Sequence, residues 1–182
     1  MESERMTDPS GILVLFSPIS GERPGTVSRL LRESYAELLE QDSSWEFERS
    51  NWDQYDRDVF LCPDTVGACL FLTRLEGRIA GFGSWDPRKG PECGIIGHNC
   101  ILPEFRGKGL GRLQIREIIR RFRELGMKRA VVSTNVLPFF APARRMYEAC
   151  GFLETRRGPS TSPPHRMCVE YEQVLNQSPK NR

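Results

Sequence analysis

The sequence predicts a single α/β domain with a mixed sheet and helices on both faces. Short apolar runs alternate with longer stretches of helical periodicity, in the order β-α-α-β-β-β-α-β-α-β-β, without an internal repeat. The chain has 182 residues, which is within the size of one domain. We expect this domain to span 1–182, with its core in 11–175, a frayed start over 1–10 and a polar tail over 176–182.

The first half of the chain is predicted to hold four strands and two helices. A short apolar run over 12–16, ended by Pro18 and Gly21, indicates the first strand. Leucine and valine residues at helical spacing predict a helix over 24–41, and an aromatic-rich stretch predicts a second helix or helix–loop over 45–59. Three further strands are expected over the following ranges: 68–75, 78–85 and 92–102.

The second half is predicted to hold two helices and three strands. Residues 110–125 have one apolar face and one arginine-rich face, which is typical of an amphipathic helix, and Gly126 is placed to end it. A strand over 130–134 and a helix over 138–150 follow. The last two strands are joined by a loop rich in glycine, proline and serine, and they are expected over the following ranges: 152–156 and 167–174.

The overall charge and the cysteine content exclude several classes of function. Lys and Arg number 26 against 24 Asp and Glu, so we expect no nucleic-acid partner. The six cysteines form no C-x-x-C pair and only His98 and His165 are histidines, which disfavours a metal site and predicts free thiols in a reducing cytoplasm. The apolar run over 12–16 is too short for a signal peptide or a membrane span, so we expect no membrane partner.

A glycine-rich turn between a strand and a helix carries the main functional signal. Such a turn directs backbone N–H groups and the positive end of the helix dipole to one place, and its glycines let a ligand approach the backbone. The side chains of Arg106, Lys108 and Arg112 add positive charge. Together these features predict a binding site for an anion, a pyrophosphate first of all. The turn fits neither a P-loop, because of Leu102, nor a dinucleotide fingerprint, because of Arg112. The stretch reads Asn99-Cys100-Ile101-Leu102-Pro103-Glu104-Phe105-Arg106-Gly107-Lys108-Gly109-Leu110-Gly111-Arg112.

Two blocks of sequence together resemble a known family. The first block is the pattern R-x-x-G-x-G at Arg106, Gly109 and Gly111. The second block is a strand that ends at Asn135, followed by a helix that contains Tyr147 and then by Gly-Phe. In this order and at this spacing, the two blocks resemble the acyl-CoA signature of the GNAT superfamily of N-acetyltransferases.

The resemblance implies a fold, a cosubstrate and a binding site. It covers 68–157, and by element order 11–175, and it implies a GNAT-like, mostly antiparallel sheet of about seven strands whose fourth and fifth strands splay apart. It also implies that acetyl-CoA is the acyl donor. The pyrophosphate would lie on the backbone of 106–112 and the pantetheine arm beside 99–101, at a strand edge that offers backbone groups to an amide. Asn135, at the end of the next strand, is a further expected contact.

The resemblance and the acid–base chemistry of acyl transfer suggest two catalytic residues. Tyr147 is the candidate general acid, because a phenol with a pKa of about 10 can protonate a leaving thiolate. The alternative for this tyrosine is a packing role in the core. His98 is the candidate general base for the amine, because imidazole titrates near neutrality. The alternatives are a structural histidine and deprotonation through water, since strand alternation turns His98 away from Ile95 and Gly97 unless a bulge intervenes.

The acceptor is predicted to be a cationic amine. Residues 37–64 hold nine acidic and two basic side chains, whereas 104–129 hold nine basic and three acidic ones, which suits the phosphates of CoA. In the resembling fold the acidic segment helps to line the acceptor site. Trp52, Asp56 and Trp85 are the expected contacts, through cation–π and Coulomb attraction. The alternative is an acidic helix face that is only exposed to solvent.

The predicted activity is transfer of an acetyl group from acetyl-CoA to a primary amine, either a small molecule or a peptide, in the cytoplasm. An alternative is a non-catalytic acyl-CoA-binding or sensing domain, which the lack of an acid at positions 95 and 97 favours and Tyr147 disfavours. A nucleic-acid-binding domain that uses the arginines of 112–123 is disfavoured, because no aromatic residues interleave with them in the way that stacking requires. The sequence leaves open which amine is acetylated and whether the chain forms a homodimer.

Overall fold

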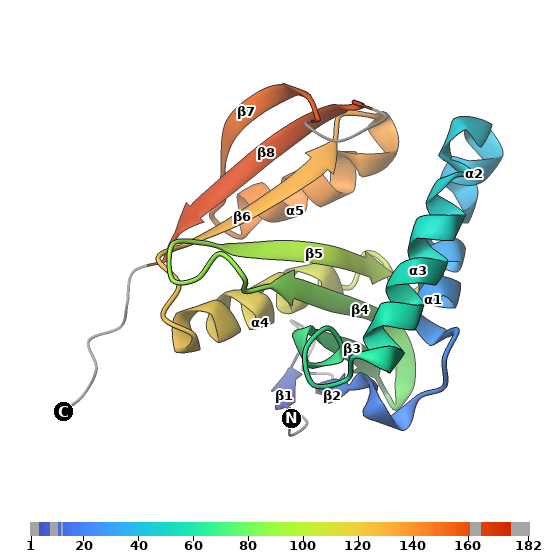
Figure 1. Ribbon diagram of the computed structural model, residues 1–182, viewed down its shortest axis with the longest axis vertical. Coiled ribbons are helices and arrows are strands. Elements are labelled where there is room, and N and C mark those ends of the chain that lie inside the picture. The colour runs from blue at the N-terminus through green and yellow to red at the C-terminus, as the bar shows by residue number, and fades with distance from the viewer. Residues whose placement is uncertain (1–3, 8–10, 12, 161–164, 176–182) are drawn as a thin grey trace. The chain divides into compact units, whose positions relative to one another are not determined.

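The computed structural model describes residues 4–7, 11, 13–160 and 165–175 (Figure 1). Its internal contacts divide the chain into two compact units. The first unit comprises 1–84 and 98–114, and the second comprises 85–97 and 115–182. Three elements have residues in both units: β4 (Arg78–Asp86), β5 (Gly94–Ile101) and α4 (Leu110–Glu124).

The strands of the first unit form an antiparallel sheet. Three of them lie entirely in this unit: β1 (Glu4–Thr7), β2 (Leu13–Pro18) and β3 (Leu70–Leu75). β2 pairs antiparallel with β1 and with β3, and β3 pairs antiparallel with β4. The end of β5 lies beside β4, because the Leu102 N–H donates to the Ala80 carbonyl at 2.8 Å and the Ser84 hydroxyl donates to the His98 carbonyl at 2.8 Å.

Helices cover both faces of this sheet, as the sequence predicts. On one face, the Cys100 thiol of β5 donates to the Leu30 carbonyl of α1 (Thr26–Ser34) at 3.9 Å. On the other face, the Thr73 hydroxyl of β3 accepts a hydrogen bond of 2.8 Å from Gln114 of α4. Because successive side chains of a strand point to opposite faces, His98 lies on the same face as Cys100.

The helix predicted over 24–41 is divided in two. α1 ends at Ser34, Tyr35 leaves the helical conformation (φ −108°, ψ 9°), and α2 (Ala36–Gln41) follows. At this break the Tyr35 ring packs against the Trp52 ring of α3 (Glu48–Leu61), with centroids 5.4 Å apart. Short 3-10 turns complete the helical elements of the chain: Ile19–Gly21, Ser43–Trp45, Gly67–Cys69, Pro103–Phe105 and Pro138–Phe140.

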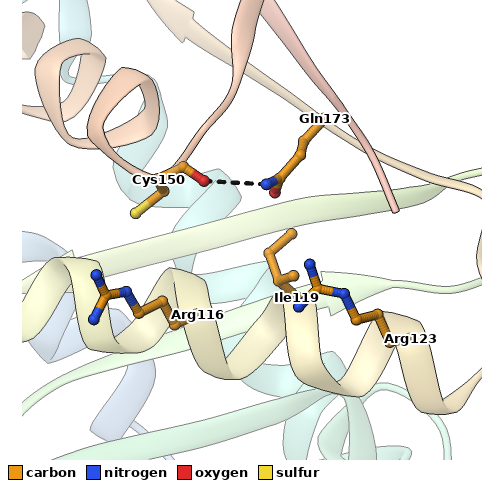
Figure 2. A pocket seen from close by; sticks show the side chains of 5 residues that line it. All are labelled: Arg116, Ile119, Arg123, Cys150 and Gln173. Carbon is orange, nitrogen blue, oxygen red and sulfur yellow. Dashed lines mark hydrogen bonds between the residues drawn. The ribbon is translucent and has the colours of Figure 1, made fainter. Parts of the chain in front are cut away.

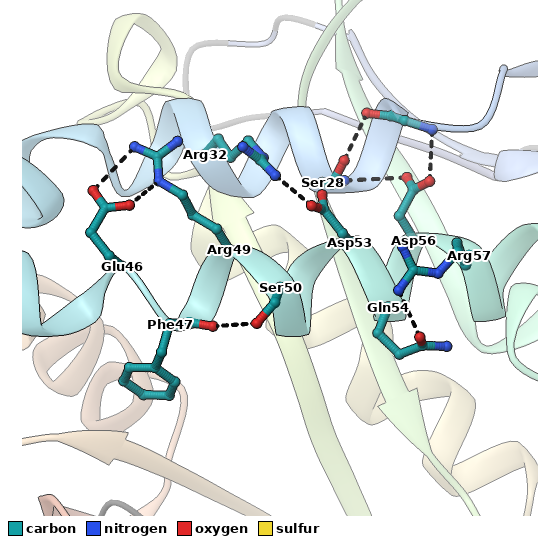
Figure 3. Close-up of polar contacts among 11 residues, drawn as sticks. Ser28, Arg32, Glu46, Phe47, Arg49, Ser50, Asp53, Gln54, Asp56 and Arg57 are labelled. Atoms are coloured by element: carbon teal, nitrogen blue, oxygen red, sulfur yellow. Dashed lines mark hydrogen bonds and ion pairs between the residues drawn. The ribbon is translucent and has the colours of Figure 1, made fainter.

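A buried carboxylate joins α3 to the start of α1. Asp56 accepts hydrogen bonds from three backbone N–H groups, those of Gly25 at 2.6 Å, Val27 at 2.8 Å and Ser28 at 3.2 Å. Figure 3 shows the contact between Asp56 and Ser28. The first N–H groups of a helix have no partner within the helix, and negative charge is favourable beside them. Only 4% of Asp56 is exposed. Asp56 therefore caps α1 from outside that helix and fixes α3 against it.

The second unit is built around one parallel strand pair. Its remaining elements are β6 (Arg129–Asn135), α5 (Ala141–Ala149), β7 (Leu153–Pro159) and β8 (Met167–Val174). β5 pairs parallel with β6 at Gly94–Ala130 and Ile95–Val131, and β8 pairs antiparallel with both β6 and β7. Among the strand registers of the described residues this is the one parallel pair, so the predicted mixed, mostly antiparallel sheet is confirmed. The splaying of these two strands stays a prediction.

Helix α4 is amphipathic, and part of its arginine face is buried. Its apolar side chains at Ile115, Ile118 and Phe122 are fully buried. Glu117, which is 1% exposed, accepts hydrogen bonds from Arg121 at 2.6 Å and from Arg120 at 2.9 Å. The Arg121 guanidinium also lies 4.8 Å from the centre of the Trp85 ring. Of the predicted arginine face, Arg120 is thus held in a structural contact, whereas Arg112, Arg116 and Arg123 are exposed as expected.

One strand lies where a frayed start was predicted, so that prediction is wrong for 4–7. These residues pair with β2 in a register that runs from Glu4–Phe16 to Thr7–Leu13. The segment Glu-Arg-Met-Thr shows no apolar alternation, so its strand depends on backbone pairing with β2, which is a tertiary contact. Ile12, the loop 161–164 and the tail 176–182 lie outside the described residues. In the part of the chain that is described, no helix is both long and apolar enough to cross a bilayer.

We expect Asp56→Ala to lower the free energy of unfolding by about 2 kcal/mol or more, because three N–H groups at the start of α1, two of them buried, lose their acceptor. The matched control is Asp53→Ala on the same helix, whose exposed ion pair with Arg32 should contribute less than about 1 kcal/mol. Urea unfolding followed by circular dichroism measures both. Equal losses for the two variants would contradict the capping role of Asp56.

Candidate functional site

The turn between β5 and α4 has a backbone that requires glycine at two positions. Gly107 (φ +77°) and Gly109 (φ +79°) are both left-handed, a conformation that costs other residues roughly 1–2 kcal/mol each. An added Cβ on Gly107 would meet nothing within 4 Å, so the backbone angle and not crowding requires this glycine. The turn leads directly into α4 at Leu110, where the Leu113 N–H donates to the Gly109 carbonyl at 3.2 Å. The first N–H groups of the helix therefore lie at the glycine turn.

Two side chains hold this turn in place. Arg106 donates from Nη2 to the Ser34 carbonyl of α1 at 2.6 Å and from Nε to the Ile101 carbonyl of β5 at 3.1 Å. Gln114, of which 1% is exposed, donates both to Thr73 at 2.8 Å and to the Cys100 carbonyl at 3.1 Å. Arg106 thus acts through its side chain as a brace. Gln114 is a residue that the sequence analysis missed, since its role depends on a contact with a distant strand.

The surface of the turn is cationic. Lys108 and Arg112 are exposed, and the Lys108 ammonium lies 5.5 Å from the centre of the Phe105 ring. Together with the positive end of the α4 dipole, these charges favour an anionic ligand. The predicted residues of this stretch, from Asn99 to Arg112, all belong to the first unit. Contact of these residues with the phosphate groups of acetyl-CoA stays a prediction.

The Cys100 thiol beside this turn is structural. It is buried, and its burial raises the pKa of the thiol to about 11. At neutral pH this group is therefore a protonated thiol, and it lacks the reactivity of a thiolate. The Cys100 thiol of this strand therefore does not serve as a nucleophile, and contact of 99–101 with the pantetheine arm stays a prediction.

His98 lies on β5 beside an aromatic ring of α3. Its imidazole and the Tyr55 ring have centroids 5.0 Å apart and planes inclined by 50°. His98 is exposed, whereas Tyr55 is half-buried. Desolvation of the imidazole by the protein atoms around it lowers the pKa of His98, so this side chain is neutral at pH 7. A neutral imidazole is the form that can accept a proton.

Tyr55 and Ser84 complete a cluster around His98, which we call the His98 cluster. Burial raises the pKa of Tyr55 to about 12, and a side-chain hydrogen bond with Ser84 opposes this rise. Ser84 in turn donates to the backbone carbonyl of His98. Tyr55 lies in the segment that was expected to line the acceptor site, but its contact with His98 and the role of Ser84 were not predicted, because they depend on how α3 and β4 fold against β5.

In the second unit, Tyr147 lies in an aromatic cluster. Its ring centroid is 5.9 Å from that of Phe152 and 6.0 Å from that of Tyr171, and 3% of Tyr147 is exposed. Asn135 ends β6, and its side-chain oxygen accepts the Leu137 N–H at 2.9 Å, which shapes the turn into α5. The catalytic role of Tyr147 and the cosubstrate contact of Asn135 stay predictions.

The three residues predicted to contact the acceptor are all buried. Trp52 packs against Tyr35, and Trp85 lies beneath the Arg121 guanidinium. For Asp56 a correction is needed, since both carboxylate oxygens already accept backbone N–H groups of α1. We therefore assign Asp56 a structural role, whereas acceptor contact by Trp52 and Trp85 stays a prediction.

Much of the acidic segment is paired within itself or with α1. Asp53 accepts a hydrogen bond of 2.6 Å from Arg32, which lowers the pKa of Asp53, and Glu46 pairs with Arg49 (Figure 3). These pairs reduce the negative charge that an acceptor would meet. For Asp53 and Glu46, the structure therefore supports the alternative interpretation, in which part of the acidic segment is a helix face in contact with solvent.

A pocket of about 140 Å³ opens on α4 in the second unit. Figure 2 shows the side chains that line it: Arg116, Ile119, Arg123, Cys150 and Gln173. Gln173 donates to the Cys150 carbonyl at 3.2 Å. None of these residues belongs to the predicted site.

Comparisons with known proteins show the family to which the chain belongs. Residues 29–152 match the acetyltransferase (GNAT) family. The chain is 30% identical to the uncharacterized N-acetyltransferase YjgM of Escherichia coli strain K12. The alignment spans 129 residues, which are 69% of this chain and 74% of that protein.

Solved structures share the fold at low sequence identity. The ribosomal L7/L12 alpha-N-protein acetyltransferase RimL, in complex with coenzyme A, has a TM-score of 0.68 at 13% identity and matches 96% of this chain and all of that one (100%). A GNAT family acetyltransferase from Elizabethkingia anophelis with acetyl-CoA bound has a TM-score of 0.50 at 17% identity, over 58% of this chain and 75% of that one. The chain described here therefore belongs to the GNAT family and is an acetyl-CoA-dependent acyltransferase.

Proposed function

We propose that the protein moves the acetyl group of acetyl-CoA to a primary amine by direct attack of the amine on the thioester. A C–N bond forms, the C–S bond breaks after a tetrahedral intermediate, the amine loses a proton and the CoA thiolate gains one. The turn over 106–112 is the observation that carries this proposal. Its two left-handed glycines and its exposed cations suit a pyrophosphate at the start of α4.

Acetyl-CoA binding is assigned to the turn and to the strand before it. The phosphates would accept hydrogen bonds from backbone N–H groups at the start of α4 and meet the charges of Lys108 and Arg112. The pantetheine arm would run along 99–101, where a backbone N–H near Cys100 or Ile101 would stabilise the oxyanion. The rigidity of this strand end, which Arg106 and Gln114 supply, supports that assignment because oriented donors need no reorganisation.

His98 is the proposed base. It is exposed, it lies on the α1–α3 face of the sheet, and its lowered pKa leaves it neutral at pH 7. A neutral imidazole can take the proton of an attacking ammonium, either directly or through a water molecule. Ile95 and Gly97 have no acidic side chain that could act as a base. The proposal therefore assigns this role to His98 on the same strand.

Tyr147 is the proposed acid that protonates the CoA thiolate. Its position before Gly-Phe matches the family pattern, and its burial among aromatic rings fixes the side chain. Asn135 is proposed as a further contact of acetyl-CoA. The chain uses no metal in this proposal.

The acceptor is proposed to be an amine that carries positive charge before it reacts, either a small molecule or the end of a peptide. The acidic excess of 37–64 supports this class, although the ion pairs of Asp53 and Glu46 reduce its strength. RimL, which shares the fold, acts on a protein α-amine, and this supports keeping peptide termini among the acceptors to be tested.

We expect Gly107→Ala to weaken acetyl-CoA binding about fivefold or more, because alanine resists the left-handed backbone by roughly 1 kcal/mol. The matched control is Gly77→Ala, which has the same conformation (φ +79°) and the same open surroundings in the β3–β4 hairpin. Isothermal calorimetry with acetyl-CoA measures both. If the two variants bind equally well, the turn does not hold the donor.

We expect Tyr147→Phe to lower kcat roughly 100-fold or more while the affinity for acetyl-CoA changes little, because the ring stays and only the proton donor is lost. Release of free CoA thiol with a panel of cationic amines and peptides measures turnover. Tyr171→Phe, in the same aromatic cluster, is the matched control and should keep its kcat. An unchanged kcat for Tyr147→Phe would remove this tyrosine from the mechanism.

A further inference from the structure

Tyr55 of α3 contacts the side chain of His98 and, through Ser84, its backbone. We propose that Tyr55 is a positioning residue for His98, whose ring orients the imidazole and shields one of its sides from water. In this way Tyr55 would set the pH below which the enzyme loses activity. The inference rests on the proposed role of His98 as the base.

The contact leaves His98 both held and accessible. The two ring centroids are 5.0 Å apart with an interplanar angle of 50°, which is a favourable tilted arrangement of two rings. His98 is nevertheless exposed, whereas Tyr55 is half-buried. A base needs this combination, since one side must be fixed by the protein while another side meets the amine.

Tyr55 is itself fixed from two directions. Its hydroxyl has a hydrogen bond with Ser84, which donates to the His98 carbonyl at 2.8 Å. Its neighbour Asp56 binds three backbone N–H groups at the start of α1. The ring therefore belongs to a helix that is clamped one residue further along the chain.

The groups around His98 are uncharged at neutral pH. Tyr55 on α3 keeps its proton up to about pH 12, Ser84 on β4 carries no charge, and the Cys69 thiol lies near Tyr55. Among the described residues, desolvation is the cause identified for the lowered pKa of His98. Removing the ring should therefore let water reach the side of the imidazole that the ring covers, and return the pKa of His98 toward the ordinary value of about 6.5.

The direct test is an NMR titration of the imidazole in the full chain. The chain has two histidines, so a His165→Asn background leaves His98 as the single imidazole signal. We expect the pKa of His98 to lie below about 6.5 in this background, and to rise by about half a unit or more in Tyr55→Ala. Tyr55→Phe should keep the low value because it keeps the ring. Tyr35→Ala, which removes a ring that packs on Trp52, is the control and should also keep it.

Tyr55→Gln serves as the ring-free variant if Tyr55→Ala does not fold. An unchanged pKa of His98 in the folded ring-free variant would overturn the proposal. That result is independent of turnover, so it is distinguishable from a failure of the proposed function, which would appear as no CoA release by the wild-type enzyme with any amine.

The kinetic readout is the acid limb of kcat/KM against pH. Activity falls as the pH drops through the pKa of the free base, so in the wild type this limb should lie below about pH 6.5. It should move to higher pH in the ring-free variant by the same amount as the NMR value, and His98→Ala should lose the limb. If the NMR value moves and the acid limb does not, Tyr55 does not control turnover and the proposal is wrong.

Discussion

The left-handed backbone at Gly107 and Gly109 is the constraint on which the proposed donor site depends. An ordinary residue at either position would favour another path for the chain, and the N–H groups at the start of α4 would lose their common direction. The turn is also tied to its surroundings, by Arg106 to α1 and by Gln114 to β3 and β5. Local conformation thus shapes the proposed anion site, and tertiary hydrogen bonds hold it in place.

The elements that the sequence predicts well are those whose signal is local. The apolar stripe of α4 and the glycine turn before it need no knowledge of the rest of the chain. By contrast, β1 at 4–7 exists through pairing with β2, and the break at Tyr35 accompanies a contact with Trp52 of α3. Both depend on residues far away in the sequence. Composition and periodicity could not have located either of them.

The acidic segment shows why charge in a sequence is a poor guide to a site. Asp56 and Asp53 are three residues apart on one helix, yet Asp56 is buried as the cap of α1 while Asp53 lies in an exposed ion pair with Arg32. Burial decides which role a carboxylate takes, and burial is set by packing against α1. The same holds on α4, where Glu117 is enclosed with Arg121. The contact between Tyr55 and His98 escaped prediction for this reason too, because it follows from the position of α3.

The most direct test of the donor site is a titration with acetyl-CoA followed through the backbone amide resonances of the whole chain. The account predicts that the amides of 107–112 shift strongly and saturate together, because the phosphates bind to the backbone there. If saturating acetyl-CoA shifts amides only outside 99–112, or shifts none, the turn is not the donor site and the account is wrong.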